Sequence, residues 1–102
     1  MRLKVTRSTG NVFRDVGFTS REAERLRVRS ELLTRVQETI RKRGLTQAAV
    51  AKLLGVHPPR VSDVMRGRID LFSIETLIDM LASLGMSVKL VTTKTRRRAG
   101  AA

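Results

Sequence analysis

One stretch of the sequence, QAAVAKLLGVHPPRVSDVMR (residues 47–66), places two short helical patterns on either side of a glycine. Ala51 supplies a small side chain at the point where two such helices would cross at a steep angle. Gly55 follows four residues later, where the turn is expected to need a positive φ, which glycine adopts without steric penalty. The remaining apolar positions fall on the inward faces of the pair: Val50, Leu54, Val56, Val61 and Val64.

These spacings match the helix-turn-helix pattern. A small residue precedes the turn glycine by four positions, and β-branched apolar residues follow it by six and by nine. Each position alone is a weak signal, but the full set is specific. The plain alternative is a helical hairpin inside a bundle, which the coincidence with strong basic charge disfavours.

Capping residues and glycines mark the other helices. Thr19 and Glu22 stand at capping-box spacing, so a helix is expected to begin there and to continue, by its apolar repeat, to just before Gly44. The pattern leaves open whether Ser30 interrupts this helix. Further helices are expected over residues 46–54, 58–66 and 73–84.

The apolar period changes to about two over residues 86–92, where Met86, Val88 and Leu90 share one side, and this predicts a single strand. The expected fold is therefore mainly α, a compact helix-turn-helix domain of four to five helices with a short C-terminal β-strand. This domain takes residues 18–92. Residues 1–17 are interpreted as an N-terminal arm and residues 93–102 as a basic flexible tail.

The charge of the chain is strongly unbalanced. Its 102 residues include 21 Lys and Arg against 9 Asp and Glu, a formal net charge of +12, so the preferred partner should be a polyanion. Three Phe are the only aromatic residues, which disfavours a stacking platform for single strands and an amphipathic membrane-surface helix. Double-stranded DNA fits best, and a merely soluble basic surface is the alternative.

Several classes of site are not expected. The chain has no cysteine, which excludes disulfides, thiolate zinc sites and cysteine nucleophiles and suits a reducing compartment. No apolar run approaches the ~20 residues of a membrane span, and the N-terminus lacks a signal-peptide core, so we expect a cytoplasmic protein. His57 is the only histidine and has no evident triad or metal partner. Neither an enzyme nor a metal or cofactor site is predicted.

The second helix of the pair should carry the DNA-reading surface, because its inward face is taken by Val61, Val64 and Met65. Arg60 lies near the end that this motif inserts deepest into the major groove, where its fork can engage O6 and N7 of guanine. A phosphate clamp is an equal alternative for Arg60. The predicted DNA contacts are Thr46, Gln47, His57, Pro59, Arg60, Ser62, Asp63, Arg66 and Arg68.

The outward-facing residues of this helix are the candidate readers: Pro59, Arg60, Ser62, Asp63 and Arg66. Several of the predicted contacts are expected to be to the DNA backbone. Gln47 begins the first helix of the pair, where a polar side chain and free N–H groups can meet a phosphate. Arg66 and Arg68 should add phosphate contacts, and Ser62 can bond a base or a phosphate. Three cations at residues 41–43 end the preceding helix, where they also complement the helix dipole.

Asp63 is the one unfavourable charge in this stretch. It can accept a hydrogen bond from a cytosine amino group, or it can pair with Arg60 or Arg66 at helical spacing. We favour the pair within the helix.

Three segments, LTQAAVAKLLGV, PRVSDVMRG and FSIETLIDMLASLG, together resemble the phage-repressor-like XRE group of helix-turn-helix regulators over residues 45–90. The upstream segment GNVFRDVGF, with the helix after it, is similar to the compact HigA-like antitoxins of bacterial toxin-antitoxin operons. The resemblance implies a DNA-binding domain of about five helices, a homodimer and repression of the protein's own operon. It also implies a RelE-like ribonuclease toxin as partner.

By the same resemblance, the family's phosphate-contacting Gln falls on Gln47, its recognition-helix Arg on Arg60 and its Ser on Ser62. The chain departs from the family at His57 and Pro58, where members usually have Ser or Thr followed by Gln. Proline suits the first helical position. It cannot supply the glutamine's hydrogen bonds, so the target sequence is expected to differ.

The sequence therefore predicts a sequence-specific transcriptional regulator, nucleoid-associated in a bacterial cytoplasm, which binds an inverted repeat as a dimer and represses its own antitoxin operon. One alternative is a protein-interaction module that mainly neutralises a toxin, and another is a non-specific nucleoid-type DNA binder. The strand at residues 86–92 is expected to pair with its symmetry mate, because an unpaired edge invites another chain. Alternatively, the arm near residues 4–6 pairs with it and helices form the dimer.

Overall fold

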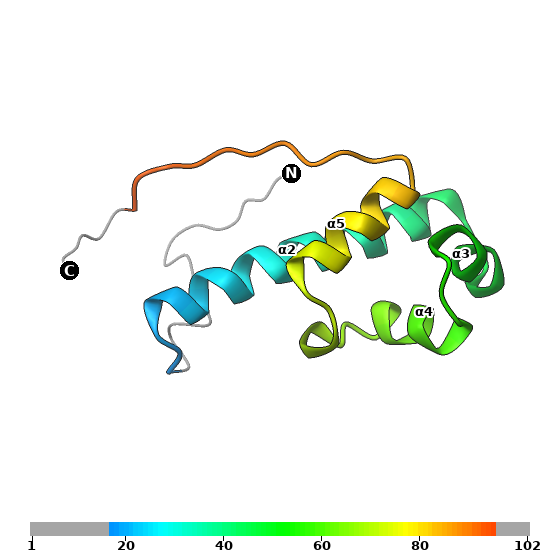
Figure 1. Cartoon of the computed structure of the whole chain (residues 1–102), viewed down its shortest axis with the longest axis horizontal. Coiled ribbons are helices and arrows are strands. Elements are labelled where there is room, and N and C mark those ends of the chain that lie inside the picture. Colours follow the sequence, from blue (N-terminus) through cyan, green and yellow to red (C-terminus); the bar gives the residue numbers. More distant parts are fainter. Residues whose placement is uncertain (1–16, 96–102) are drawn as a thin grey trace.

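The computed structural model describes residues 17–95, so nearly all of the predicted arm, including the alternative strand near residues 4–6, and most of the tail lie outside the described residues. Within this part the chain forms four α-helices and one 3-10 turn (Figure 1). They are α2 (Ser20–Arg43), α3 (Gln47–Leu54), α4 (Pro58–Met65), η1 (Ile69–Leu71) and α5 (Ile74–Ser83).

Helix α2 is continuous over 24 residues and passes through Ser30 without a break. Its start is the predicted capping box, in which Thr19 Oγ1 accepts from Glu22 N at 3.1 Å and Thr19 N donates to Glu22 Oε1 at 3.0 Å. Its end is the predicted glycine, since Gly44 adopts a left-handed conformation with φ 60°. The open question at Ser30 is thus settled in favour of one long helix.

The three shorter helices begin close to the predicted residues. Thr46 Oγ1 accepts from Ala49 N at 3.1 Å and starts α3, and Ser73 Oγ accepts from Thr76 N at 3.1 Å and starts α5. Helix α4 has no side-chain cap at His57. It starts instead with two prolines. In the first turn of a helix the N–H groups have no partner within the helix, so the N–H that proline lacks costs no hydrogen bond there.

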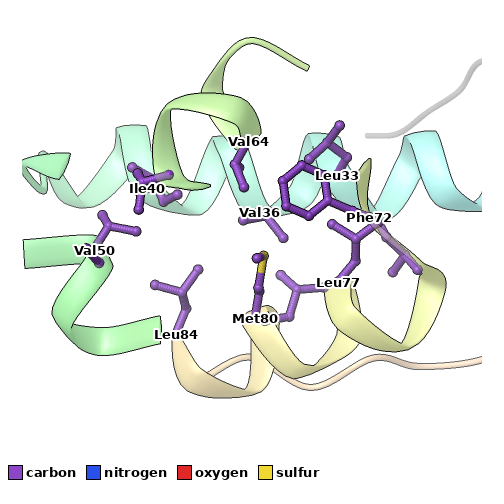
Figure 2. Close-up of a cluster of buried hydrophobic side chains, with 13 residues drawn as sticks. Leu33, Val36, Ile40, Val50, Val64, Phe72, Leu77, Met80 and Leu84 are labelled. Carbon is purple, nitrogen blue, oxygen red and sulfur yellow. The ribbon is translucent and has the colours of Figure 1, made fainter. Parts of the chain in front are cut away.

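The core is a layer of apolar side chains between α2, the α3–α4 pair and α5 (Figure 2). Helix α5 packs along α2, while α3 and α4 pack against each other and close the side of the bundle. Phe72 and Leu77 are both fully buried and stand at the positions of a hydrophobic staple around the start of α5. The core thereby fixes the α3–α4 pair relative to α2 and α5.

The predicted strand at residues 86–92 is not formed in the single chain described here. These residues leave the end of α5 as an extended segment, and no strand is assigned anywhere in residues 17–95 (Figure 1). A strand requires a neighbour that bonds its N–H and C=O groups. The alternating pattern only shows that one side of the segment is apolar, so the prediction failed because this chain offers no such neighbour within residues 17–95.

Candidate nucleic-acid interface

The turn between α3 and α4 has the geometry that the sequence predicted. Gly55 has φ 69° and ψ 35°, the left-handed conformation that favours glycine. Val56 N donates to Ala51 O at 2.9 Å and closes the turn. Ala51 is buried where the two helices meet, and Val61 and Val64 of α4 are fully buried beneath them.

The nine predicted DNA contacts all lie on this helix pair or at its ends. Thr46 and Gln47 form the start of α3, and His57 caps α4. The side chains of Gln47 and His57 are exposed. Within and after α4, Pro59, Arg66 and Arg68 are exposed, whereas Arg60, Ser62 and Asp63 are half-buried.

Charge on the helix-turn-helix segment is nearly all of one sign. Residues 41–68 contain seven Lys and Arg but a single Asp. Six of the seven cations are exposed: Arg41, Lys42, Arg43, Lys52, Arg66 and Arg68. Within residues 17–95, the ion pairs all lie on α2 and none involves these six side chains. The segment therefore presents uncompensated positive charge.

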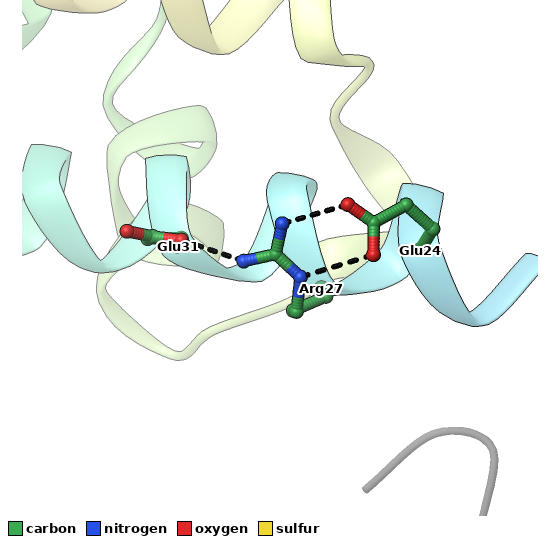
Figure 3. A network of polar contacts seen from close by, with 3 residues as sticks. All are labelled: Glu24, Arg27 and Glu31. Atoms are coloured by element: carbon green, nitrogen blue, oxygen red, sulfur yellow. Dashed lines mark hydrogen bonds and ion pairs between the residues drawn. The ribbon is translucent and has the colours of Figure 1, made fainter. Parts of the chain in front are cut away.

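The ion pairs of α2 all lie before its last turn, which carries Arg41, Lys42 and Arg43. Arg27 bonds Glu24 at 2.7 Å and Glu31 at 3.1 Å on either side of it (Figure 3). The hydrogen bond to Glu24 raises the pKa of Arg27 above its ordinary value. Arg35 and Glu38 form a longer pair at 3.7 Å. Residues 20–40 hold four Glu against five Arg, whereas the helix-turn-helix segment is left uncompensated, a distribution that favours a polyanion at that segment.

Arg60 does not make the predicted pair with Asp63. Its guanidinium carbon lies 4.4 Å from the centroid of the Phe72 ring, a cation–π contact. Among the described residues, Asp63 has no ion pair with Arg60 or with Arg66. The expected pair was wrong because helical spacing permits an ion pair without requiring it, and the ring offers Arg60 a different partner.

The start of α3 also suits a phosphate. Gln47 is the first helical residue, and the Thr46 side chain already occupies the N–H of Ala49. The N–H groups of Gln47 and Ala48 belong to the first turn and have no carbonyl within the helix to bond. They remain available to an anion beside the exposed Gln47 side chain.

Two residues that hold α4 in place were not predicted. Gln37 bonds a main-chain carbonyl of α4 from α2, and Phe72 supports Arg60 from the segment before α5. A signal for Phe72 was present, because an apolar residue just before a helix-capping Ser is the first half of a hydrophobic staple. No comparable signal existed for Gln37, whose partner lies 27 residues away.

Nowhere in residues 17–95 do three or more His, Cys, Asp or Glu side chains gather in a way that could hold a metal ion. None of the helices in this range is long and apolar enough to cross a membrane.

Comparison with known proteins agrees with this geometry. Residues 12–93 match a family described as a helix-turn-helix domain. One similar solved structure is provisionally described as an XRE family transcriptional regulator, with 32% sequence identity and a TM-score of 0.67. The alignment covers 79% of this chain and 91% of that chain. No curated protein shows significant sequence similarity.

Proposed function

The chain belongs to the XRE group of helix-turn-helix proteins. We propose that it is a sequence-specific transcriptional regulator that binds double-stranded DNA through α3 and α4. The observation that carries the proposal is the charge of residues 41–68, which hold seven cations and one acid on the helix pair itself. A basic helix-turn-helix segment with exposed cations is the expected electrostatic footprint of a DNA-binding surface.

In this proposal α4 reads bases and its surroundings hold the backbone. Arg60 engages a guanine in the major groove. Since Asp63 has no ion pair among the described residues, it is left to accept from a cytosine amino group. The exposed Pro59, which has no N–H to donate, lies on the reading face of α4 beside Arg60. The remaining contacts position α4 on the phosphates: Thr46, Gln47, His57, Ser62, Arg66 and Arg68.

The protein acts as a homodimer on an inverted repeat. One two-turn recognition helix reads only a few base pairs, which is too little to select one site in a genome. The extended segment at residues 86–92 is the favoured dimer contact. Beyond Met86, whose N–H donates to Leu81 O at 2.8 Å, its backbone is unpaired within residues 17–95, and Leu90 and Val91 are each 81% exposed. Pairing with the symmetry mate would complete the strand that the single chain lacks.

Its regulatory role is that of an autorepressing antitoxin with a RelE-like toxin as partner, in the bacterial cytoplasm at the nucleoid. The support is the resemblance of the segment from residue 10 onwards to HigA-like proteins. A pull-down with the product of the neighbouring open reading frame tests this role. A stable complex with a basic ribonuclease supports it, whereas a neighbour of unrelated chemistry that does not bind contradicts it.

Footprinting on the DNA upstream of the protein's own gene tests the DNA-binding proposal. We expect a protected inverted repeat that survives excess random DNA. Arg66→Ala combined with Arg68→Ala should abolish protection, while Arg21→Ala combined with Arg25→Ala removes the same charge from exposed sites near the start of α2 and should not. Uniform coverage without a defined repeat, or equal losses for the two double variants, would show a non-specific basic binder.

A further inference from the structure

We infer that Phe72 is a positioning residue for Arg60. In this inference, which rests on the proposed function, the aromatic ring holds the guanidinium in the orientation from which it reads a base. Phe72 lies outside the helix-turn-helix pair, between η1 and α5. A residue outside the motif would therefore tune how the motif reads DNA.

The ring of Phe72 is a rigid platform. Its side chain is 1% exposed and belongs to the core cluster, where it lies beside Leu33 and Leu77 (Figure 2). Its main-chain N–H donates to Ile69 O at 3.3 Å, which fixes the backbone on the other side. A buried ring held in this way has no freedom to follow a moving side chain, so any partner on its face is held by it.

Arg60 occupies that face with its guanidinium carbon 4.4 Å from the ring centroid, well inside the ~6 Å range of cation–π attraction. The side chain is half-buried, yet its nitrogens form no hydrogen bond or ion pair among the described residues. None of those nitrogens is sealed away from solvent either. The guanidinium is therefore restrained by the ring that it lies over, while its N–H donors stay available.

This combination suits recognition of a guanine edge. A bidentate contact to O6 and N7 needs two N–H groups in one plane, at a fixed angle to the groove. An unsupported arginine would lose the freedom of its flexible side chain on binding. Stacking on Phe72 removes part of that freedom beforehand, so the base preference that comes from Arg60 should depend on the ring.

A double-mutant cycle on the full chain tests the inference. The variants are Phe72→Leu, Arg60→Ala and the double variant, with binding measured by anisotropy on the operator and on an operator whose contacted guanine is changed. Phe72→Leu alone should weaken operator binding about two- to fivefold, the lower part of the range for cation–π contacts, and should reduce the preference for guanine. In the Arg60→Ala background the same substitution should change neither quantity.

Two controls separate positioning from folding. Leu84→Val trims another fully buried core side chain, at the far end of α5, and should lower stability without any coupling to Arg60. Phe72→Met also lacks a ring, but its unbranched, flexible side chain can adapt to the space the ring leaves, and it should reproduce the binding defect if Phe72→Leu proves unfolded by circular dichroism. Equal losses from Phe72→Leu in both Arg60 backgrounds would overturn the inference, because Phe72 would then act only through the fold.

The same cycle, measured by denaturant unfolding without DNA, distinguishes the Arg60–Phe72 contact itself from its role in reading DNA. Coupling between Arg60 and Phe72 in unfolding shows that the contact exists, whatever the protein binds. A wild-type chain with no preferred operator would overturn the proposed function and the reading role together. Additive binding losses on an operator that the wild type does prefer would overturn the positioning role alone.

Discussion

The side-chain amide of Gln37, in α2, donates a 2.7 Å hydrogen bond to the main-chain oxygen of Val64, near the end of α4. Val64 O also accepts from Gly67 N at 3.0 Å, so two donors converge on this carbonyl. The contact joins the proposed recognition helix directly to the longest helix of the domain. It is a direct polar link between α4 and α2, in addition to the apolar packing of the core.

Gln37→Glu should therefore destabilise the domain, although glutamate has nearly the same size and shape as glutamine. The substitution replaces the donating amide with a carboxylate that faces a carbonyl oxygen, and leaving such a group unsatisfied costs about 1–3 kcal/mol. Glu38→Gln is the matched control, since Glu38 is exposed and has only a 3.7 Å pair with Arg35. Urea unfolding should show a clear loss for the first variant and a change within about 0.5 kcal/mol for the second. Equal stabilities would remove the structural role given to Gln37.

Gly55→Val should lower the melting temperature through backbone strain. A Cβ at Gly55 would meet no atom within 4 Å, so the Cβ itself makes no clash. The left-handed φ of 69° costs an L-residue about 1–2 kcal/mol, or roughly 4–8 °C per kcal/mol in a domain of this size. Gly55→Asn should lose less, because asparagine tolerates this conformation better. An unchanged melting temperature for the valine variant would contradict this account of the turn.

These cases show which parts of the fold could be predicted from the sequence. The caps at Thr19, Thr46 and Ser73 depend on hydrogen bonds between residues three apart, and the turn at Gly55 depends on one backbone conformation. Such features are local, so residue type and spacing in the sequence are enough to predict them. The buried positions Val61 and Val64 followed from helical periodicity in the same way.

The features that sequence reasoning missed depend on how distant segments pack. Gln37 meets Val64, and Arg60 meets Phe72, only because the angles between helices bring them together. Local spacing suggested an ion pair for Arg60 that the tertiary contact replaced. Whether the segment at residues 86–92 becomes a strand depends on a partner, which an alternating pattern cannot supply.

The capping box should make stability depend on pH at its acidic end. The hydrogen bond from Thr19 N lowers the pKa of Glu22 below its ordinary value. The folded pKa is then below the unfolded one, so this contribution is complete above about pH 4.5 and is lost as the pH falls through the lowered value. Glu22→Gln can keep the box but does not titrate. Wild type should lose stability relative to this variant below pH 4.5 in thermal melts, and a constant difference would contradict the prediction.

Arg60→Ala should weaken operator binding by about 1–3 kcal/mol and relax discrimination at one base pair, if Arg60 reads a guanine. Arg66→Ala is the comparison, since an exposed phosphate contact should weaken operator and random DNA alike and reduce the salt slope by about one. Binding titrations on both DNAs at several salt concentrations measure these effects. Equal losses on operator and random DNA for Arg60→Ala would make Arg60 a phosphate clamp.

The dimer should depend on the backbone of the extended segment. Leu90 is 81% exposed, and the described residues form no strand that includes it, so Leu90→Pro should leave the single chain folded. Proline removes one N–H from a strand ladder and is poorly tolerated inside a sheet. Sedimentation at micromolar concentration should therefore show a monomer for Leu90→Pro and a dimer for Thr95→Pro, whose substitution lies beyond the paired residues.

Loss of the dimer should also weaken binding to the operator. Two linked recognition helices should protect half-sites whose centres lie about 10 base pairs, or a multiple, apart. Binding should weaken steeply with salt as phosphate counterions are released. Leu90→Pro should reduce protection to single half-sites at much higher protein concentration, because each α4 then binds without its mate. A wild-type monomer that protects one asymmetric half-site would contradict the dimer itself. A dimer that survives removal of every residue after Gly85 would contradict only the role of the segment, and would place the interface on the helices.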